Sequence, residues 1–120
     1  MSHYVDGFVL PVPTENLAAY QAMAEKGAKV WLEHGALEYR ECVADDTDVK
    51  FGLPFATGIN ANAGETIVFA WIVFESREHR DEVNAKVMQD PRLCEGMDEK
   101  TMPFDSKRML YGGFKTIVKA

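Results

Sequence analysis

The chain has 120 residues, of which 47% are hydrophobic and 27% are charged, and its formal net charge is −6. This size and balance predict one soluble globular domain over residues 1–120. The acidic balance disfavours nucleic-acid partners, because Lys and Arg must neutralise phosphates. No apolar run reaches the roughly 18 to 20 residues that span a bilayer, and no signal peptide is apparent, so we expect a cytoplasmic protein without a membrane partner.

The first strand and the first helix are predicted from periodicity. Residues 4–12 form a strand pattern in which Asp6 shares a face with apolar side chains. A helix is predicted over residues 15–34 with Thr14 as its N-cap, and its end at His34 is marked by the capping residue Gly35. Its apolar stripe at helical spacing comprises Leu17, Tyr20, Ala24, Ala28 and Trp31.

Two further strands follow, separated by a long connection. Residues 37–44 predict a strand with Tyr39 and Glu41 on one face. The connection over residues 45–65 is rich in turn residues and long for a hairpin loop, which indicates local structure or function. Residues 66–75 are apolar on both faces, as in a central strand that is covered on both sides.

The last part of the chain predicts a helix and a strand. The helix covers residues 77–89 with Ser76 as its N-cap, residues 93–100 predict a short extra turn, and residues 112–119 predict the final strand. The resulting order is β-α-β-β-α-β. We therefore expect an α+β, ferredoxin-like fold with an antiparallel four-stranded sheet and two helices on one face.

Two helices cover only one face of such a sheet. The other face is expected to carry apolar side chains, among them Phe8, Tyr39, Trp71 or Phe74, depending on the register. Exposing them would leave an unusually large apolar patch on a monomer. The sequence therefore predicts a homodimer whose sheets face each other, with either a barrel-like cavity or a packed core between them.

Two acid/base candidates emerge from these placements. Asp6 is a candidate general base in the sheet cavity, because burial raises a carboxyl pKa; the alternative is an ion pair or a hydrogen bond to the backbone. His34 is a candidate acid/base residue near the cavity mouth; the alternative is a cation at a helix C-terminus.

The remaining candidates would bind a ligand. Glu41 and Tyr39 share a strand face and would line the cavity; the alternative for Glu41 is a paired or solvent-facing carboxylate. Trp71 is either a ligand platform or part of the core or dimer interface. Arg108 offers a planar fork for an acidic small ligand; the alternative is an ion pair with Asp105 or Asp6.

Other familiar kinds of site are not predicted. Gly112-Gly113 lack the GxxxxGK[ST] pattern of a phosphate loop and lead into a strand, so a bulge or a close backbone approach is expected there. Cys42 and Cys94 form no CxxC pair and are expected to be free, mostly buried thiols. The histidines and acidic groups match no metal-ligand spacing, so neither a metal nor a cofactor is expected.

Five blocks together resemble the DUF1428 family, a group of small bacterial proteins of unknown function. They are YVDGFVLPVP (Tyr4 to Pro13), HGALEYRECVADD (His34 to Asp46), ETIVFAWIVF (Glu65 to Phe74), MQDPR (Met88 to Arg92) and MPFDSKRMLYGGFK (Met102 to Lys115). The resemblance implies a dimeric α+β barrel. The Thr47–Gly64 loop is richer in Gly, Pro and Asn than is typical.

The resemblance supplies no activity. The wider dimeric α+β barrel group includes cofactor-free monooxygenases and haem-degrading enzymes, which is an analogy of fold only. The first hypothesis is an enzyme or binder acting on a small molecule in the cavity between the sheets. The alternative is a non-catalytic interaction or regulatory dimer, and the third is an RNA-associated protein, which the net charge disfavours.

Overall fold

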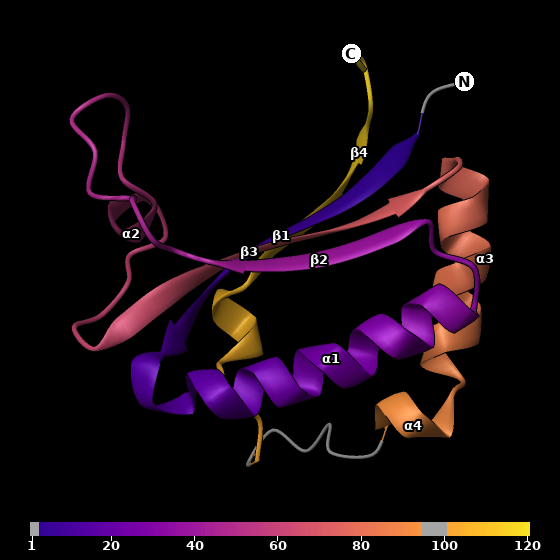
Figure 1. Cartoon of the computed structure of the whole chain (residues 1–120), viewed down its shortest axis with the longest axis horizontal. Helices are drawn as coiled ribbons and strands as arrows, with labels where there is room; N and C mark the ends of the chain where they lie inside the picture. The colour runs from indigo at the N-terminus through magenta and orange to yellow at the C-terminus, as the bar shows by residue number, and fades with distance from the viewer. Residues whose placement is uncertain (1–2, 95–100) are drawn as a thin grey trace.

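The computed structural model describes residues 3–94 and 101–120. The four strands form one antiparallel sheet in the order β2-β3-β1-β4, and α1 and α3 lie on the same side of it (Figure 1). The predicted ferredoxin-like fold is therefore confirmed. The elements are β1 (Tyr4–Pro13), η1 (Thr14–Asn16), α1 (Leu17–Glu33), β2 (Glu38–Val43), α2 (Phe55–Gly58), β3 (Glu65–Phe74), α3 (Arg77–Met88), α4 (Pro91–Cys94), η2 (Ser106–Arg108) and β4 (Leu110–Lys115).

The predicted boundaries differ from the structure at a few ends. Thr14 does not cap α1, because Thr14–Asn16 form a 3-10 turn ahead of it. Ser76 caps α3 as predicted, and its Oγ accepts a hydrogen bond from the backbone N–H of His79 at 3.0 Å. β4 begins at Leu110, two residues early. Of the turn predicted over residues 93–100, residues 95–100 lie outside the described residues.

The strand register decides which side chains face the helices. Asp6 on β1 lies opposite Ile72 on β3, and Tyr39 on β2 lies opposite the same residue. Because Ile72 is buried beneath the helices, the alternation along each strand puts Asp6 and Tyr39 on the covered face. Of the four aromatic residues considered for the open face, only Trp71 lies there. Phe8, Tyr39 and Phe74 point toward the helices instead.

The core fills the space between the helices and the sheet in two parts. One part surrounds α3 and the last turns of α1; its buried residues are Tyr4, Val30, Ala36, Ile72, Phe74, Val83 and Val87. The other lies beneath the first turns of α1; its buried residues are Leu10, Val12, Tyr20, Ala24, Val68 and Ala70. Polar side chains on this covered face are therefore held in an apolar setting, where each needs a partner.

The opposite face of the sheet is open and apolar. Phe69, Leu110 and Phe114 are 46%, 57% and 62% exposed on it. The segment between β2 and β3, which includes α2, projects past the end of the sheet, clear of α1 and α3 (Figure 1). Phe51 in this segment is 95% exposed. Exposed apolar side chains in this number are unusual for a monomeric protein.

The paired glycines of β4 mark a close approach of the backbone. Six consecutive residue pairs join β1 and β4 from Tyr4 to Val9, so the pairing contains no bulge. A β-carbon on Gly113 would overlap the Tyr4 hydroxyl and come within 2.8 Å of an Arg80 nitrogen. The predicted close approach is confirmed at Gly113. Cys42 is free and exposed, so its expected burial is wrong.

Candidate functional site

A carboxylate and two tyrosines meet between α1 and β2. The Tyr20 hydroxyl, from α1, donates a hydrogen bond to Glu41 Oε1 at 2.5 Å. The Tyr39 hydroxyl donates to Glu41 Oε2 at 2.6 Å. Tyr39 and Glu41 are two residues apart on β2 and therefore share a face, whereas Tyr20 reaches them from the apolar stripe of the helix. Each oxygen of the carboxylate thus has its own phenolic donor.

The phenols of this cluster remain protonated. Burial raises the pKa of Tyr20, and the hydrogen bond and negative charge of Glu41 raise it further. The pKa of Tyr39 is raised by burial first and then by the charge of the same carboxylate. Both tyrosines therefore act as hydrogen-bond donors to Glu41 at neutral pH, and neither becomes a phenolate.

Glu41 lies where two hollows meet. The outer hollow is an open groove of about 400 Å³ between α1 and β2, and the inner one has about 240 Å³ between α1, the sheet and residues 102–109. Tyr20, Ala24, Tyr39 and Glu41 line both hollows. The carboxylate therefore stands at the passage from an open groove to an apolar interior.

Asp6 lies beneath the helices in a second polar cluster and is only 1% exposed. Its Oδ2 accepts hydrogen bonds from Asn84 Nδ2 at 3.3 Å and from the Tyr111 hydroxyl at 3.4 Å. Its Oδ1 has no hydrogen-bond partner and lies 3.7 Å from Arg80 Nε. Burial raises the pKa of Asp6, and the bond from Asn84 and the charge of Arg80 offset that rise only in part.

The Asp6 cluster joins β1, α1, α3 and β4. Arg80 of α3 donates to the Tyr4 hydroxyl at 3.2 Å and lies over the same ring, 5.0 Å from its centre. Trp31 Nε1 of α1 donates to Asn84 Oδ1 at 3.0 Å. Asp6 therefore has the ion-pair partner that the alternative interpretation required, and that partner is Arg80.

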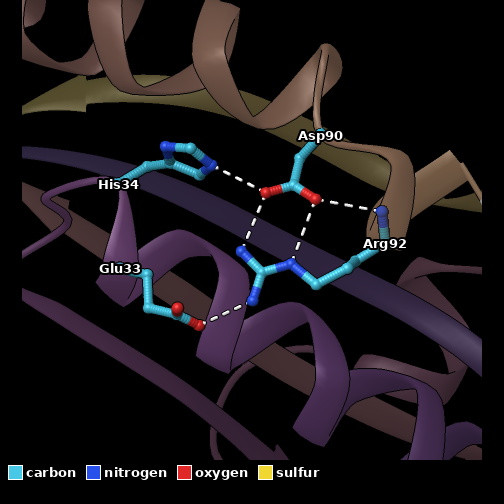
Figure 2. A network of polar contacts seen from close by, with 4 residues as sticks. All are labelled: Glu33, His34, Asp90 and Arg92. Carbon is cyan, nitrogen blue, oxygen red and sulfur yellow. Dashed lines mark hydrogen bonds and ion pairs between the residues drawn. The ribbon is translucent and has the colours of Figure 1, made fainter.

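His34 belongs to a third cluster, which connects α1 to the turn between α3 and α4. Figure 2 shows Asp90 between His34 and Arg92. His34 Nε2 lies 2.9 Å from Asp90 Oδ2, and Arg92 donates to Asp90 from its backbone and its guanidinium. Arg92 also donates to Glu33 Oε2 at 2.8 Å. The hydrogen bonds from Arg92 and His34 hold the pKa of Asp90 well below its usual value.

Arg108 is held by a partner that the sequence did not suggest. Its guanidinium makes a bidentate contact with Glu65, at 2.6 and 3.0 Å, and donates to the backbone carbonyl of Asn60 at 3.0 Å. Glu65 also accepts from the backbone N–H of Asn62 at 2.6 Å. Arg108 thereby fixes the end of the β2–β3 connection. The ion-pair partner of Arg108 is Glu65 and not Asp105 or Asp6, which the alternative interpretation named.

Trp71 lies on the open face of the sheet. Its Nε1 donates to Glu38 Oε2 at 2.7 Å, and the Arg40 guanidinium lies 5.8 Å from the ring centre. Phe69 is its aromatic neighbour, at 5.4 Å between ring centres, and Phe55 of α2 lies 6.3 Å from Phe69. This row of rings extends from the sheet toward the projecting segment.

The structure thus brings two of the predicted site residues together, Tyr39 and Glu41. Asp6, His34 and Arg108 belong to three other clusters, and Trp71 lies on the opposite face. We expected Asp6 or Glu41 to line a cavity between two sheets. This expectation is wrong, because the register turns both carboxylates toward the helices.

Sequence reasoning missed the partners of these residues. Tyr20 was treated only as part of an apolar stripe, although a buried tyrosine hydroxyl usually needs a partner, which is a signal that could have identified it. Glu65 and Arg80 gave no comparable signal, because their contacts with Arg108 and Asp6 join positions far apart in the chain.

The part of the chain that the structure describes has neither a metal-binding cluster nor a helix that could span a membrane. Within residues 3–94 and 101–120, no three His, Cys, Asp or Glu side chains gather in a way that could hold a metal ion. In the same part of the chain, none of the helices combines the length and the apolar character needed to cross a bilayer.

Comparison with known sequences gives one consistent result. Residues 3–106 match the family described as "Protein of unknown function (DUF1428)". The uncharacterized protein YbaA of Escherichia coli strain K12 is 45% identical over 115 residues, which cover 96% of this chain and 97% of that protein. YbaA of Shigella flexneri matches with the same identity and coverage.

Solved structures share the fold at much lower identity. A dimeric ferredoxin-like protein from an uncultured marine organism superposes with a TM-score of 0.64 and 8% identity, and all of both chains is covered. A NIPSNAP family protein of unknown function from Agrobacterium tumefaciens gives a TM-score of 0.59 at 15% identity, over 95% of this chain and 87% of that one. At these identities the likeness establishes the fold alone.

Proposed function

This chain belongs to the DUF1428 family, which is described as of unknown function, and we propose from the geometry of its own site that it binds a small molecule at Glu41. The ligand would lie between α1 and the sheet, in the inner hollow and the adjoining groove. This proposal keeps the predicted class of function and moves the site from the dimer interface to the interior of each protomer.

The arrangement around Glu41 carries this proposal. A half-buried carboxylate between the phenols of buried Tyr20 and half-buried Tyr39 costs free energy unless its polar atoms are satisfied. Apolar pockets with a few convergent polar groups are the usual form of ligand sites. Glu41 is also the group here that would act as a base if the bound molecule reacts.

Fragment screening by ligand-observed NMR tests the proposal. We expect small, largely apolar fragments to bind wild-type protein and to bind more weakly to Glu41→Gln. Glu15→Gln, an exposed carboxylate in the η1 turn, is the matched control and should bind as the wild type does. Binding that is insensitive to Glu41→Gln, or no binding by any fragment, would contradict the proposal.

A second proposal concerns assembly, and it is supported by the open face of the sheet. We propose that two protomers pack with these faces together. The exposed side chains Phe69, Leu110 and Phe114 form an apolar surface suited to an isologous contact, and the similar protein of the marine organism is described as dimeric. The projecting segment with Phe51 would extend that contact.

Sedimentation velocity tests the assembly. Wild-type protein is expected to sediment as a dimer at micromolar concentration, and Phe69→Lys is expected to shift it toward monomer, because the substitution places a charge in the apolar contact. Leu32→Lys, an exposed apolar residue of α1, serves as the control and should stay dimeric. A monomeric wild-type protein would refute this proposal and leave the ligand site untouched.

A further inference from the structure

We infer that the Glu41 site takes an organic amine, with its protonated ammonium group on Glu41 and its apolar body in the inner hollow. This inference rests on the proposed function, because it names the chemical class of the ligand bound there. It follows from three properties of the site: the hydrogen-bonding atoms left available, the charges that line the two hollows, and the shape of the apolar part.

The hydrogen-bonding atoms that the cluster of Tyr20, Tyr39 and Glu41 leaves available are acceptors. A tyrosine hydroxyl has one hydrogen to donate, and both Tyr20 and Tyr39 give theirs to Glu41. An ionised carboxylate only accepts, and each of its oxygens retains acceptor capacity after one hydrogen bond. A ligand that reaches the cluster therefore meets the carboxylate and the lone pairs of two phenols. Its head group must donate.

The charges around the cluster have one sign. Among the lining residues that the structure describes, the two hollows include Glu25 and Glu41 and contain neither Lys nor Arg. An anionic head group at the cluster would be repelled by these carboxylates, and neither phenol has a second hydrogen to donate to it. An ammonium group supplies three donors and a compensating charge, and hydrogen bonds between ionised partners are about twice as strong as neutral ones.

The size and lining of the inner hollow determine which apolar group the ligand can carry. Its volume of about 240 Å³ is small for a ligand pocket and fits a single ring with a short chain. The lining is mostly apolar, and its methionines adapt easily to the shape of a guest. Residues that would contact the body include Phe8, Met23, Trp31, Phe104 and Met109.

A matched ligand series tests the inference. We would titrate 3-phenylpropylamine, 3-phenylpropanol and 3-phenylpropionate into the full chain by NMR at neutral pH and constant ionic strength. The three molecules share one apolar body and differ in the head group. We expect the amine to bind at least about tenfold more tightly than the alcohol, because its hydrogen bond to Glu41 joins two charged groups. The acid should bind most weakly.

Variants at Glu41 and Glu15 test whether the preference for the ammonium head group depends on the Glu41 carboxylate. Glu41→Gln should remove the preference of the amine over the alcohol, whereas Glu15→Gln should keep it. The preference of wild-type protein for the amine is measured without any variant, so it tests the inference even if Glu41→Gln folds poorly.

The outcomes also distinguish this inference from the proposed function. If the alcohol or the acid binds wild-type protein as tightly as the amine and competes for the same resonances, the amine inference is wrong and the site remains a ligand site. If no member of the series and no fragment binds, both are wrong.

Discussion

The backbone of Gly113 lies directly against the phenol of Tyr4, its diagonal neighbour across the pairing of β1 and β4. A β-carbon at Gly113 would overlap the Tyr4 hydroxyl and approach Tyr4 Cε2 to 2.7 Å. The space is needed because the Arg80 guanidinium lies over the Tyr4 ring, 5.0 Å from the ring centre. Glycine at this position therefore allows Arg80 to reach Asp6.

Gly113→Ala is predicted to destabilise the protein by about 1 to 3 kcal/mol, because overpacking displaces side chains that have no room to move. Gly112→Ala is the matched control. A β-carbon there would meet Phe114 at 3.7 Å, an ordinary contact. Urea denaturation of the two variants measures the difference, and equal stabilities would show that the contact with Tyr4 is easily relieved.

Tyr20→Phe and Tyr39→Phe are each predicted to lower the free energy of unfolding by about 1.5 to 3 kcal/mol, since each removes a hydrogen bond to a charged group. In a Glu41→Gln background the same substitutions should cost less, because the amide oxygen is a neutral acceptor. Chemical denaturation of the single and double variants measures this coupling. Additive losses would indicate that the phenols do not depend on the charge of Glu41.

Asp90→Asn is predicted to lower the thermal midpoint at neutral pH and to have less effect in acid. Asp90 has a lowered pKa in the folded state, so its contribution to stability is present above the usual value of 3.8 and is lost as the pH falls through the folded pKa. The difference from wild type should therefore narrow below pH 3.8. Asp48→Asn, at an exposed position, is the control, and a difference that is constant down to pH 2 would contradict the prediction.

Arg108→Lys is predicted to loosen the end of the β2–β3 connection. Lysine cannot reproduce the bidentate contact with Glu65 together with the bond to the Asn60 carbonyl. Amides of residues 59–65 should exchange faster with deuterium than in wild type, whereas Lys107→Gln, at the exposed neighbouring position, should leave them unchanged. Unchanged exchange in Arg108→Lys would show that other contacts hold the segment.

Local patterns were sufficient for the fold. The apolar run of β3, the cap at Ser76 and the stop after His34 each depend on residues close together in the chain, and together they gave the correct order of elements. Thr14 was misassigned because a good capping residue does not reveal whether the next turn is a 3-10 turn or an α-helix.

The site was less predictable because it depends on register and on distant partners. A shift of one residue moves every side chain of a strand to the other face, and no sequence pattern determined which face of β2 meets α1. Tyr39 and Glu41 were correctly grouped, since two positions on one strand share a face in any register. Tyr20 and Glu65 required the tertiary structure.

The central position of β3 has a practical consequence for genetic dissection of this protein. Asp6 and Glu41 occupy strands on either side of β3, so their backbones lie two strand spacings apart, roughly 9 to 10 Å. Trp31 nevertheless links their clusters, because it donates to Asn84 and its ring centre lies 6.0 Å from that of Tyr39. Changes at residues that share a partner can couple. A phenotype produced by a substitution at Glu41 is therefore assigned to the cluster beside α1 only when the double variant with Asp6 shows that the two effects add.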